Sequence, residues 1–518
     1  MTPTAPQDWI ARQGRWTRGL IGFGAGAVMT MGHAPVDLPW GFFVAVPVLV
    51  WLMAGSSTWR QAAWAGWAVG FGYFLTGLHW IGHAFLVDAE AFAWLLPFAL
   101  TLLPGGLALF WALGFGVSWV FRPIGPVGQV LVLAACMTLV EYLRGNILTG
   151  FPWALPGYVW VETPLLQSAS WAGPFGLTLI CLVLTGLPLV AALQRRLWPC
   201  AAAIAGFALL WGWGITRVPD QVAYAPDAPV IRVVQPNAPQ HLKWHPEHVP
   251  IFYRRLLRHT SAPAETASGQ PDLVIWPETA VNFVPAEQDA LRVQIATAAN
   301  GAPVILGALH VERSGGERIW LNSMVTIMPD GSLGPRYDKH HLVPFGEYMP
   351  FKEVFELVGL RGLAQHGGAS FGPGPAALQI GDLPRFAAAI CYEMIFPSEI
   401  VAPGPRPEWI LTITNDAWFG GFAGPQQHLA QARFRAVEQG LPVARAANTG
   451  ISTIIDSYGR MSDKLNLHKD GYVDERLPAA LSPTIYSHTY TAPTLLACML
   501  ILFAAGWSEY LRMRIDNT

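Results

Sequence analysis

Three residues in the second half of the chain could together carry out nucleophilic chemistry at a carbonyl group. Glu278, Lys339 and Cys391 each follow a short run of residues that is typical of a β-strand. A thiol attacks efficiently only as a thiolate, which a nearby base or cation brings about. A carboxylate could take the thiol proton, and an ammonium group could stabilise both the thiolate and the oxyanion that forms on the attacked carbonyl.

Each of these residues also has a plainer interpretation when it is taken alone. Glu278, in "WPE", could be a charge at a helix N-terminus, and Lys339 could be a solvated loop cation. Most single cysteines in apolar strands are inert core residues. Cys391 differs from the other cysteines, because it alone lies in the polar part of the chain. The others lie in long apolar stretches: Cys136, Cys181, Cys200 and Cys498.

Charge is distributed unevenly along the 518 residues. Charged residues make up 13% of the chain and hydrophobic residues 52%, whereas soluble domains have about 25% charged residues. Of the 32 basic and 34 acidic residues only 14 precede residue 216, and the first lysine is Lys243. This asymmetry predicts a membrane region followed by a soluble region. The net charge of -2, without a basic stripe, argues against a nucleic-acid partner.

Eight apolar stretches approach the length of about 20 residues that a transmembrane helix needs. They are 19–35, 37–54, 62–86, 91–120, 126–143, 170–192, 197–215 and 492–511. Arginines precede the first stretch and follow the second, fourth, sixth and eighth. If all eight stretches span the membrane, these arginines lie on one side of it, with Arg144 as the exception. The positive-inside rule then predicts cytoplasmic termini. A cleaved signal peptide is the alternative for the first stretch, but no small-x-small site follows it.

The same reasoning divides the chain into three parts. Residues 1–215 are predicted to form a helical membrane domain with seven spans, and residues 216–491 an outward-facing catalytic domain. Residues 492–518 are predicted to form the last span and a cytoplasmic tail.

Glu141, within the fifth span, is a functional candidate as an intramembrane acid. Its nearness to Arg144 instead favours a paired or snorkelling residue at the end of the span.

The outward region alternates between strand and helix patterns. Apolar runs bounded by Pro, Gly, Asn and Asp predict strands within 229–237, 271–278, 302–309, 322–331, 385–393, 408–418, 442–450 and 451–459. Helical periodicity occurs in 247–260, 287–300 and 425–440, the last ending at Gly440 as a C-cap. The order of these elements predicts an α/β sandwich with functional residues at strand ends.

Sequence motifs around the three residues resemble those of the nitrilase, or carbon–nitrogen hydrolase, superfamily, which places Glu, Lys and Cys in this order on an α-β-β-α sandwich. The matching stretches are "LVIWPETA" (273–280), "RYDKHHLVPFGEYMP" (336–350), "AAICYEMIFP" (388–397), "TNDAWFG" and "ARAANTGIS". The eight-span frame, with "LVPFGEYMPF" and "NDAWFGGFAGPQQHLAQARFRAVE", resembles the apolipoprotein N-acyltransferase family within that superfamily.

This resemblance implies a two-step reaction. Glu278 would act as the general base, and Lys339 would stabilise the oxyanion with the backbone N–H of Tyr392. Cys391 would take an acyl chain from a membrane phospholipid as a thioester. The α-amine of the N-terminal diacylglyceryl-cysteine of an apolipoprotein would then accept the chain. The resemblance places the enzyme in the bacterial inner membrane, with a periplasmic catalytic domain. It implies no cofactor, and the chain has no HExxH, CxxC or GxxxxGK[ST] metal or nucleotide motif.

Five further residues match positions that the family uses for support or substrate binding: Glu347, Tyr392, Glu393, Asn322 and Trp244. Glu347 and Glu393 would orient Lys339 and the wall of the site, and Trp244 would lie on a mobile loop near the acyl chain. Ordinary packing or a surface salt bridge is the alternative for each. His340 and His341 are interpreted as structural, because the glutamate already fills the role of base. His428 lies in a predicted helix and is expected to cap it or to pack.

The stretch 348–375 joins an amphipathic helix pattern, "FKEVFELVGLRGL", to a glycine-rich segment, "HGGASFGPGP". An apolar surface beside a lipid-handling site would enter the bilayer interface, and the glycines would let it move as a lid. The alternative is a surface helix whose apolar face packs on the core.

Two other classes of function remain open from the sequence. A membrane-tethered hydrolase would release the acyl group to water, and would be expected to have one anchor and a small polar pocket. A transport or scaffold protein would use the nitrilase-like region only for binding. The eight spans favour a lipid substrate over the first class, and the presence of all three catalytic residue types argues against the second.

Overall fold

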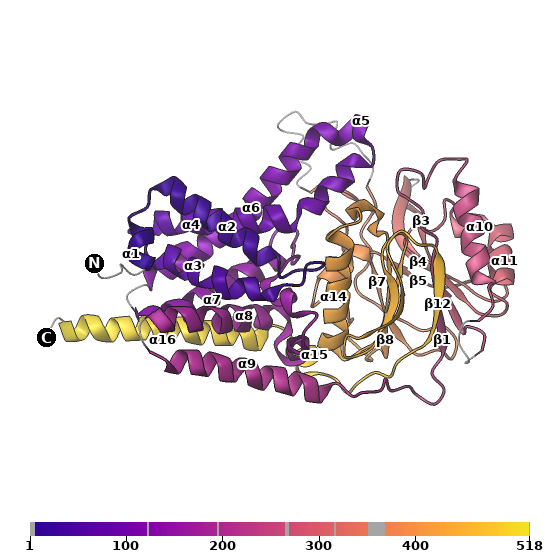
Figure 1. Ribbon diagram of the computed structural model, residues 1–518. Coiled ribbons are helices and arrows are strands. Elements are labelled where there is room, and N and C mark those ends of the chain that lie inside the picture. The colour runs from indigo at the N-terminus through magenta and orange to yellow at the C-terminus, as the bar shows by residue number, and fades with distance from the viewer. Residues whose placement is uncertain are drawn as a thin grey trace. The chain divides into compact units, whose positions relative to one another are not determined.

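The computed structural model describes residues 6–121, 124–193, 196–264, 269–314, 317–350 and 368–516 (Figure 1). The chain divides into two compact units. A helical unit comprises Met1–Pro219, Phe422–Ala430 and Thr484–Thr518, and an α/β unit comprises Asp220–Gly421 and Gln431–Pro483. The predicted amphipathic segment 351–363 lies outside the described residues.

The helical unit contains a helix at each of the eight predicted spans. They are α2 (Arg15–Thr30), α3 (Phe42–Ala54), α4 (Trp59–Gly77), α6 (Leu96–Val120), α7 (Pro126–Asn146), α8 (Ala169–Leu193), α9 (Trp198–Arg217) and α16 (Ala492–Asp516). Five segments of the described chain are helical, long and apolar enough to cross a membrane: Ala89–Val120, Pro126–Asn146, Pro164–Pro188, Trp198–Arg217 and Ala492–Ile515. A multi-span helical region is therefore confirmed, whereas the number of eight spans stays a prediction.

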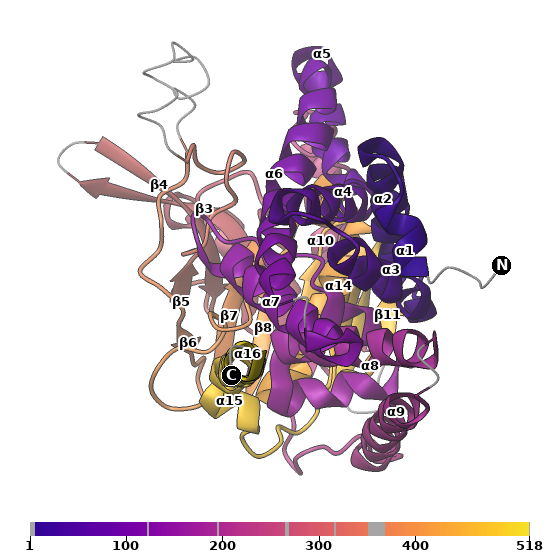
Figure 2. The same cartoon turned by 90° about the vertical axis from the view of Figure 1, so that its left-hand side faces the viewer.

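Helices α2 and α4 lie side by side and approach each other through glycines (Figures 1 and 2). A Cβ atom on Gly26 would overlap the carbonyl oxygen of Val69, and a Cβ on Gly72 would overlap that of Phe23. Small residues let transmembrane helices pack backbone against backbone, where dispersion replaces the hydrophobic effect as the attractive force.

Glu141 is paired with Arg144 as predicted, but neither side chain snorkels. Both side chains are fully buried in the helical unit and form an ion pair. Trp111 Nε1 donates to Glu141 at 2.6 Å, and Arg144 also donates to the carbonyl oxygen of Trp153 at 2.9 Å. The pair is therefore an internal crosslink of this unit, because its hydrogen bonds join α6, α7 and the following loop.

The first residues of α14 (Gly424–Gln439) belong to the helical unit. Gln427 Oε1 accepts hydrogen bonds from Trp80 at 3.2 Å and Trp153 at 2.8 Å, and its Nε2 donates to the carbonyl oxygen of Gly77. His428 is fully buried with its ring 5.5 Å from that of Trp153. This placement agrees with the prediction that His428 packs.

The α/β unit consists of two six-stranded sheets, in the orders β12-β1-β2-β3-β4-β5 and β11-β10-β9-β8-β7-β6. The first contains β12 (Gly471–Arg476), β1 (Val230–Gln235), β2 (Leu273–Ile275), β3 (Val304–Ser314), β4 (Glu317–Ile327) and β5 (Leu333–Asp338). The second contains β11 (Met461–Leu465), β10 (Ser452–Ile455), β9 (Val443–Ala447), β8 (Trp409–Thr414), β7 (Phe386–Ile390) and β6 (Ala377–Leu378). All eight predicted strands are present.

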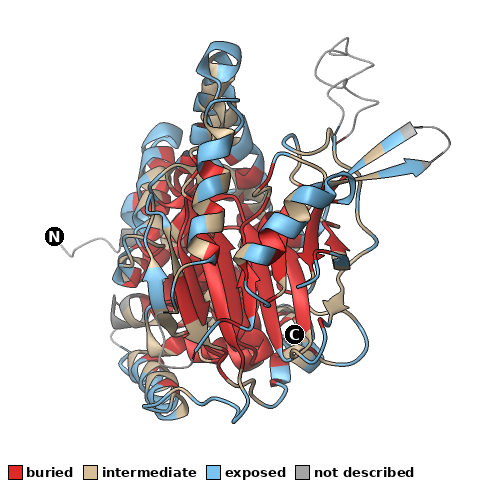
Figure 3. Cartoon of the chain, turned by 90° about the vertical axis from the view of Figure 1, so that its right-hand side faces the viewer, coloured by how far each residue is buried: buried red, intermediate tan, exposed pale blue. Residues whose placement is uncertain are grey.

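The two sheets face each other across one apolar core. Ile231 and Ile305 of the first sheet share this core with Ile390 and Ile413 of the second. Helices α10 (Val249–Thr260) and α11 (Asp289–Ala298) cover the other face of the first sheet. Figure 3 shows largely buried strands behind helices whose outer faces are exposed. With α14 beside the second sheet (Figure 1), the unit is the predicted α-β-β-α sandwich.

The close approach of α2 and α4 predicts that alanine substitutions at two glycines of α2 affect thermal stability differently. Gly26→Ala should lower the thermal unfolding midpoint of the detergent-solubilised protein, because overpacking of this kind costs about 1–3 kcal/mol. Gly24→Ala is the matched control, since a Cβ there meets no atom within 4 Å. It should leave the midpoint unchanged or raise it slightly, because alanine favours helix over glycine. Equal midpoints for the two variants would contradict the described packing.

Candidate active site

Glu278 follows the end of β2 and is held by three hydrogen-bond donors. Oε1 accepts from Asn322 Nδ2 at 2.8 Å and from Lys339 Nζ at 3.3 Å. Oε2 accepts from the backbone N–H of Asn415 at 2.9 Å. Glu278 is only 5% exposed, so its carboxylate depends on these donors rather than on water. Its orientation is consequently fixed by two side chains and one backbone group.

Lys339 follows β5 and is 1% exposed. Its Nζ lies 3.3 Å from Glu278 and 2.9 Å from Glu347. Burial alone would lower the pKa of Lys339, but the charges of Glu278 and Glu347, with a smaller contribution from Cys391, raise this pKa above its usual value. Lys339 is therefore a cation throughout the neutral range, as stabilisation of an oxyanion requires.

Glu347 completes the cluster around the ammonium group. Besides Lys339 it accepts hydrogen bonds from Asn322 Nδ2 at 2.9 Å and from the backbone N–H of Val343 at 2.8 Å. Burial would raise the pKa of Glu347, but the attraction of Lys339 and these hydrogen bonds hold it below its usual value. Lys339 and Asn322 thus each bridge the same two carboxylates, those of Glu278 and Glu347.

Cys391 lies where β7 ends and a 3-10 turn, η8 (Cys391–Ile395), begins. Its φ of 50° is in the left-handed region, which non-glycine residues rarely occupy. Strained conformations of this kind persist where the surrounding structure fixes them, often at functional sites. Here the conformation turns the chain sharply at the sulfur-bearing residue.

The pKa of the Cys391 thiol is raised, which favours its protonated form. Burial raises its pKa, the charge of Glu278 raises it further, and Lys339 opposes both. Cys391 therefore lies within electrostatic reach of both residues predicted to act with it. A protonated thiol is a weak nucleophile, so attack requires a group that accepts its proton. The structure thus brings Glu278 and Lys339 into contact and places Cys391 within electrostatic reach of both.

Comparison with known proteins gives the same assignment for both parts of the chain. Residues 25–187 match the family described as apolipoprotein N-acyltransferase N-terminal domain, and residues 233–482 match carbon-nitrogen hydrolase. The chain is 40% identical over 507 residues to the apolipoprotein N-acyltransferase of Rhodopseudomonas palustris, covering 94% of each chain. It belongs to the apolipoprotein N-acyltransferase family.

Other relatives that carry this name have similar coverage. The apolipoprotein N-acyltransferase of Brucella melitensis is 39% identical over 492 residues, which is 90% of this chain and 91% of the relative. That of Bradyrhizobium diazoefficiens is 38% identical over 511 residues, which is 94% of this chain and 95% of the relative. The similarity therefore spans both the helical region and the carbon–nitrogen hydrolase region.

In this member of the apolipoprotein N-acyltransferase family, Glu393 connects the turn of Cys391 with the loop of Lys339. The Glu393 side chain is fully buried. Oε2 accepts from the N–H of Ile390 at 2.6 Å, and Oε1 accepts from the N–H of His340 at 2.7 Å and from Tyr337 Oη at 2.9 Å. A single carboxylate thus joins the backbone before the cysteine to the backbone after the lysine.

The two histidines beside Lys339 contact other acids. Burial alone would lower the pKa of His340, but Glu393 and Glu399 raise it to about 9. His341 Nδ1 lies 2.7 Å from Glu399, and its ring stacks on Phe396 with centroids 3.7 Å apart. These contacts agree with the interpretation of both histidines as structural.

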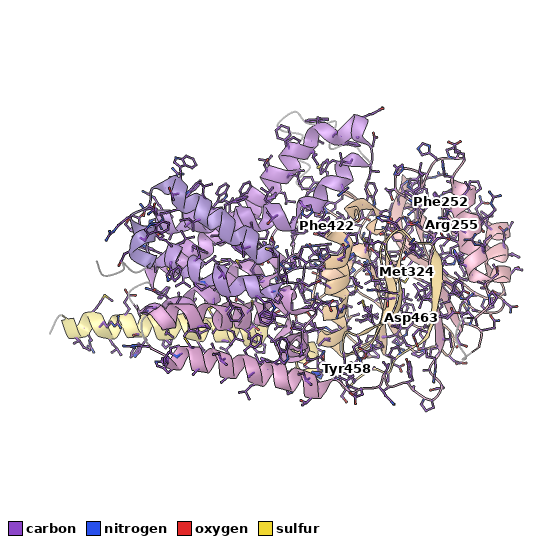
Figure 4. All side chains as sticks on the ribbon, viewed as in Figure 1. Phe252, Arg255, Met324, Phe422, Tyr458 and Asp463 are labelled. Carbon is purple, nitrogen blue, oxygen red and sulfur yellow. The ribbon has the colours of Figure 1, made fainter. Side chains whose placement is uncertain are left out.

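Tyr392 and Trp244 occupy different surroundings. Tyr392 is 6% exposed and packs edge-on against Phe396, with ring centroids 5.3 Å apart. Trp244 is 45% exposed and lines a small pocket with Val281 and Phe252. Phe252 lies on α10, where Figure 4 labels it. Trp244 is connected to the Glu278 cluster through its neighbour, Lys243, which sequence reasoning did not select.

Sequence reasoning also did not select the residues behind Glu278. The amide of Asn415 donates to Gln240 and accepts from Asn448, each at 2.8 Å. Asp416 forms a fully buried ion pair with Arg445 at 2.6 Å. The sequence signal that could have identified Asn415 and Asp416 is the polar triplet "TND" at the end of a buried strand.

Across the described ranges, no group of three or more His, Cys, Asp or Glu side chains is placed to hold a metal ion.

Proposed function

We propose that this protein transfers an acyl chain from a membrane phospholipid, through a thioester on Cys391, to the α-amine of the N-terminal diacylglyceryl-cysteine of apolipoproteins. The family name supports the acceptor and the bond that is formed. The observation that carries the mechanism is the grouping of a buried carboxylate, an ammonium group and a thiol at three strand ends: Glu278, Lys339 and Cys391. This transfer would be the last step of lipoprotein maturation.

In the first half-reaction Glu278 accepts the thiol proton of Cys391 as sulfur attacks the ester carbonyl of the phospholipid. Lys339 and the backbone N–H of Tyr392 stabilise the negative charge that develops on the carbonyl oxygen. The tetrahedral intermediate collapses, the bond to the glycerol oxygen breaks, and Glu278 returns its proton to that oxygen. The products are a lysophospholipid and an acyl thioester.

In the second half-reaction the acceptor amine attacks the thioester, and Glu278 takes the proton that the amine loses. The carbon–sulfur bond breaks, an amide forms, and the proton passes to the departing thiolate of Cys391. A thioester is activated toward amines, so the covalent intermediate divides a difficult ester-to-amide exchange into two easier steps. This sequence is a ping-pong mechanism.

The supporting residues have positional roles in this proposal. Asn322 and Glu347 hold the Glu278–Lys339 pair, and Glu393 holds the turn of Cys391 against the loop of Lys339. Tyr392 contributes its backbone N–H, and Trp244 is an exposed aromatic surface for the lipid portion of a substrate. Each role follows from the contacts of the side chain and from the resemblance to the family.

The proposal includes a location. The protein spans the bacterial inner membrane eight times, with both termini in the cytoplasm and the catalytic region in the periplasm. Residues 1–215 carry seven spans, 216–491 form the catalytic domain, and 492–518 carry the last span and tail. The distribution of arginines supports this orientation, and the apolar helices support a membrane protein.

The thioester predicts a covalent adduct. Purified protein given phospholipid alone should gain the mass of one acyl chain, on the peptide that contains "ICYEM", and hydroxylamine should remove it. A peptide with a diacylglyceryl-cysteine N-terminus should discharge the adduct quickly, whereas water should do so slowly. Intact-mass spectrometry checks this, with Cys391→Ala as the control that forms no adduct. Rapid hydrolysis without an acceptor would instead favour the lipid-hydrolase function.

The roles of base and oxyanion cation predict two inactive but folded variants. Glu278→Gln and Lys339→Ala should each slow adduct formation by about two to three orders of magnitude, because they remove the proton acceptor or the positive charge. Lys339→Arg should also be slow, since a planar guanidinium does not replace a compact ammonium at one oxygen atom. Near-normal acylation by either of the first two variants would contradict that residue's role.

The proposed orientation can be tested by labelling. A cysteine-free variant carrying Asp330→Cys should react with a membrane-impermeant thiol reagent applied from the periplasmic side. The same background carrying Arg60→Cys or Arg196→Cys should react only after the membrane is permeabilised, because the positive-inside rule places both arginines in the cytoplasm. Labelling of the position 60 variant from outside would overturn the orientation.

A further inference from the structure

Lys243 is a buried lysine that the proposed reaction does not use. It lies in the loop after β1 and is 4% exposed. Nζ donates to Thr279 Oγ1 at 2.8 Å and to the backbone carbonyl oxygen of Glu278 at 3.3 Å, and Lys243 forms no ion pair with the described residues. Lysine is seldom buried without a charged partner, because removing its ammonium group from water is costly. Its partners are instead the two residues at the predicted base.

The turn that Lys243 contacts has an unusual backbone. Thr279, directly after Glu278, has a φ of 45°, a conformation that β-branched residues rarely adopt. Strand β3 supports the other side of the turn: a Cβ on Gly307 would lie 2.5 Å from Glu278 Cα and from Thr279 N. The N–H of Gly307 donates to the carbonyl oxygen of Pro277 at 3.1 Å. The strained turn is therefore held between β3 and the Lys243 side chain.

The loop that carries Lys243 is itself anchored. Arg255 of α10 (Figure 4) donates to the carbonyl oxygen of Pro236 at 2.6 Å, at the beginning of the loop. Gln240 accepts from Asn415 Nδ2 at 2.8 Å, and the backbone N–H of Asn415 donates to Glu278 Oε2 at 2.9 Å. One loop thus contacts the backbone of Glu278 through Lys243 and supports the donor to its carboxylate through Gln240.

The hydrogen bonds of Lys243 do not require its positive charge. Burial lowers the pKa of Lys243 to about 7, against the opposing effects of Glu278 and Cys391. A neutral amine still has two N–H donors for the hydroxyl and carbonyl oxygens that it contacts. Its Nζ also lies 5.0 Å from the ring centroid of Trp244, so Lys243 lies between this exposed indole and the turn of Glu278.

We propose that Lys243 is a positioning residue for the reaction: it fixes the turn of Glu278 and Thr279 so that the Glu278 carboxylate meets the thiol of Cys391, and it connects this turn with the loop of Trp244. The inference rests on the proposed function, because it takes Glu278 as the base. Lys243 does not touch the reacting atoms, and it acts through the placement of Glu278.

The test measures the rate of adduct formation on full-length protein with phospholipid, by intact-mass spectrometry, over a range of lipid concentrations. Lys243→Met, which keeps length but has no donors, should lower the rate at saturating lipid about 10- to 100-fold, as a misplaced catalytic group does. The half-saturating lipid concentration should not change. Lys243→Gln should recover part of the rate, because its amide retains a donor. Lys464→Met, at an exposed lysine of the same unit, should match wild type.

Thr279→Val provides an independent measurement, because it removes the hydroxyl acceptor and keeps the shape of the side chain. It should slow acylation, though by no more than Lys243→Met does. The double variant should be no slower than Lys243→Met, since the hydrogen bond that Thr279→Val removes is one of the two that Lys243→Met removes. If Lys243→Met does not fold, Thr279→Val alone decides: a wild-type rate would overturn the inference.

Three results for a folded Lys243→Met variant would overturn the inference. They are a wild-type rate at saturating lipid, a change confined to the half-saturating concentration, and a lower thermal midpoint with an unchanged rate. Glu278→Gln, measured in parallel, separates this inference from the proposed function. A normal rate for Glu278→Gln, or no adduct on wild type, would refute the proposed function. A block in Glu278→Gln with a normal rate in Lys243→Met would refute only the positioning role.

Discussion

The ammonium group of Lys339 lies between the buried carboxylate of Glu278 and the half-buried carboxylate of Glu347, and the rest of the site is arranged around this contact. Placing Glu278 and Glu347 close together is costly without a cation, because the desolvation of the acids adds to their repulsion. Lys339 supplies the charge, and Asn322 supplies a neutral donor to each acid. The sheet order β2-β3-β4-β5 makes this possible, since Asn322 lies on β4, between the strands that precede Glu278 and Lys339.

The second sheet contributes the thiol and the backbone support. Strands β7 and β8 are parallel neighbours, so Cys391 and Asn415, which follow them, emerge at the same edge. Asn415 donates its N–H to Glu278, which links the ends of the two sheets. Glu393 links the neighbouring loops in the same way, by accepting from backbone N–H groups. The buried carboxylates of Glu278 and Glu393 thus hold the backbone of neighbouring loops in place, in addition to carrying charge.

Much of this arrangement could be predicted from the sequence, because strand ends follow short apolar runs that turn residues close. Glu278, Lys339 and Cys391 are predicted in this way, and the resemblance to the family adds Glu347, Asn322 and Glu393. Lys243 was missed because a lysine in a loop has no local pattern, and its contact with Thr279 spans 36 residues. The antiparallel pairing of β1 with β12, from Val230 to Arg476, likewise has no local signal. Helices α2 and α3, with 16 and 13 residues, are shorter than the about 20 residues that a transmembrane helix needs.

The raised pKa and 6% exposure of Cys391 have a consequence for inhibition and for damage. Oxidants and general alkylating agents select cysteines that are exposed thiolates. A buried, protonated sulfur is a poor target for them, even where it serves as the nucleophile of the proposed reaction. An effective covalent inhibitor would have to present its electrophilic carbon where Glu278 can accept the proton as sulfur attacks. The selectivity of such an inhibitor would come from how closely its shape matches the ester of the substrate. A more reactive electrophilic group would add little to it.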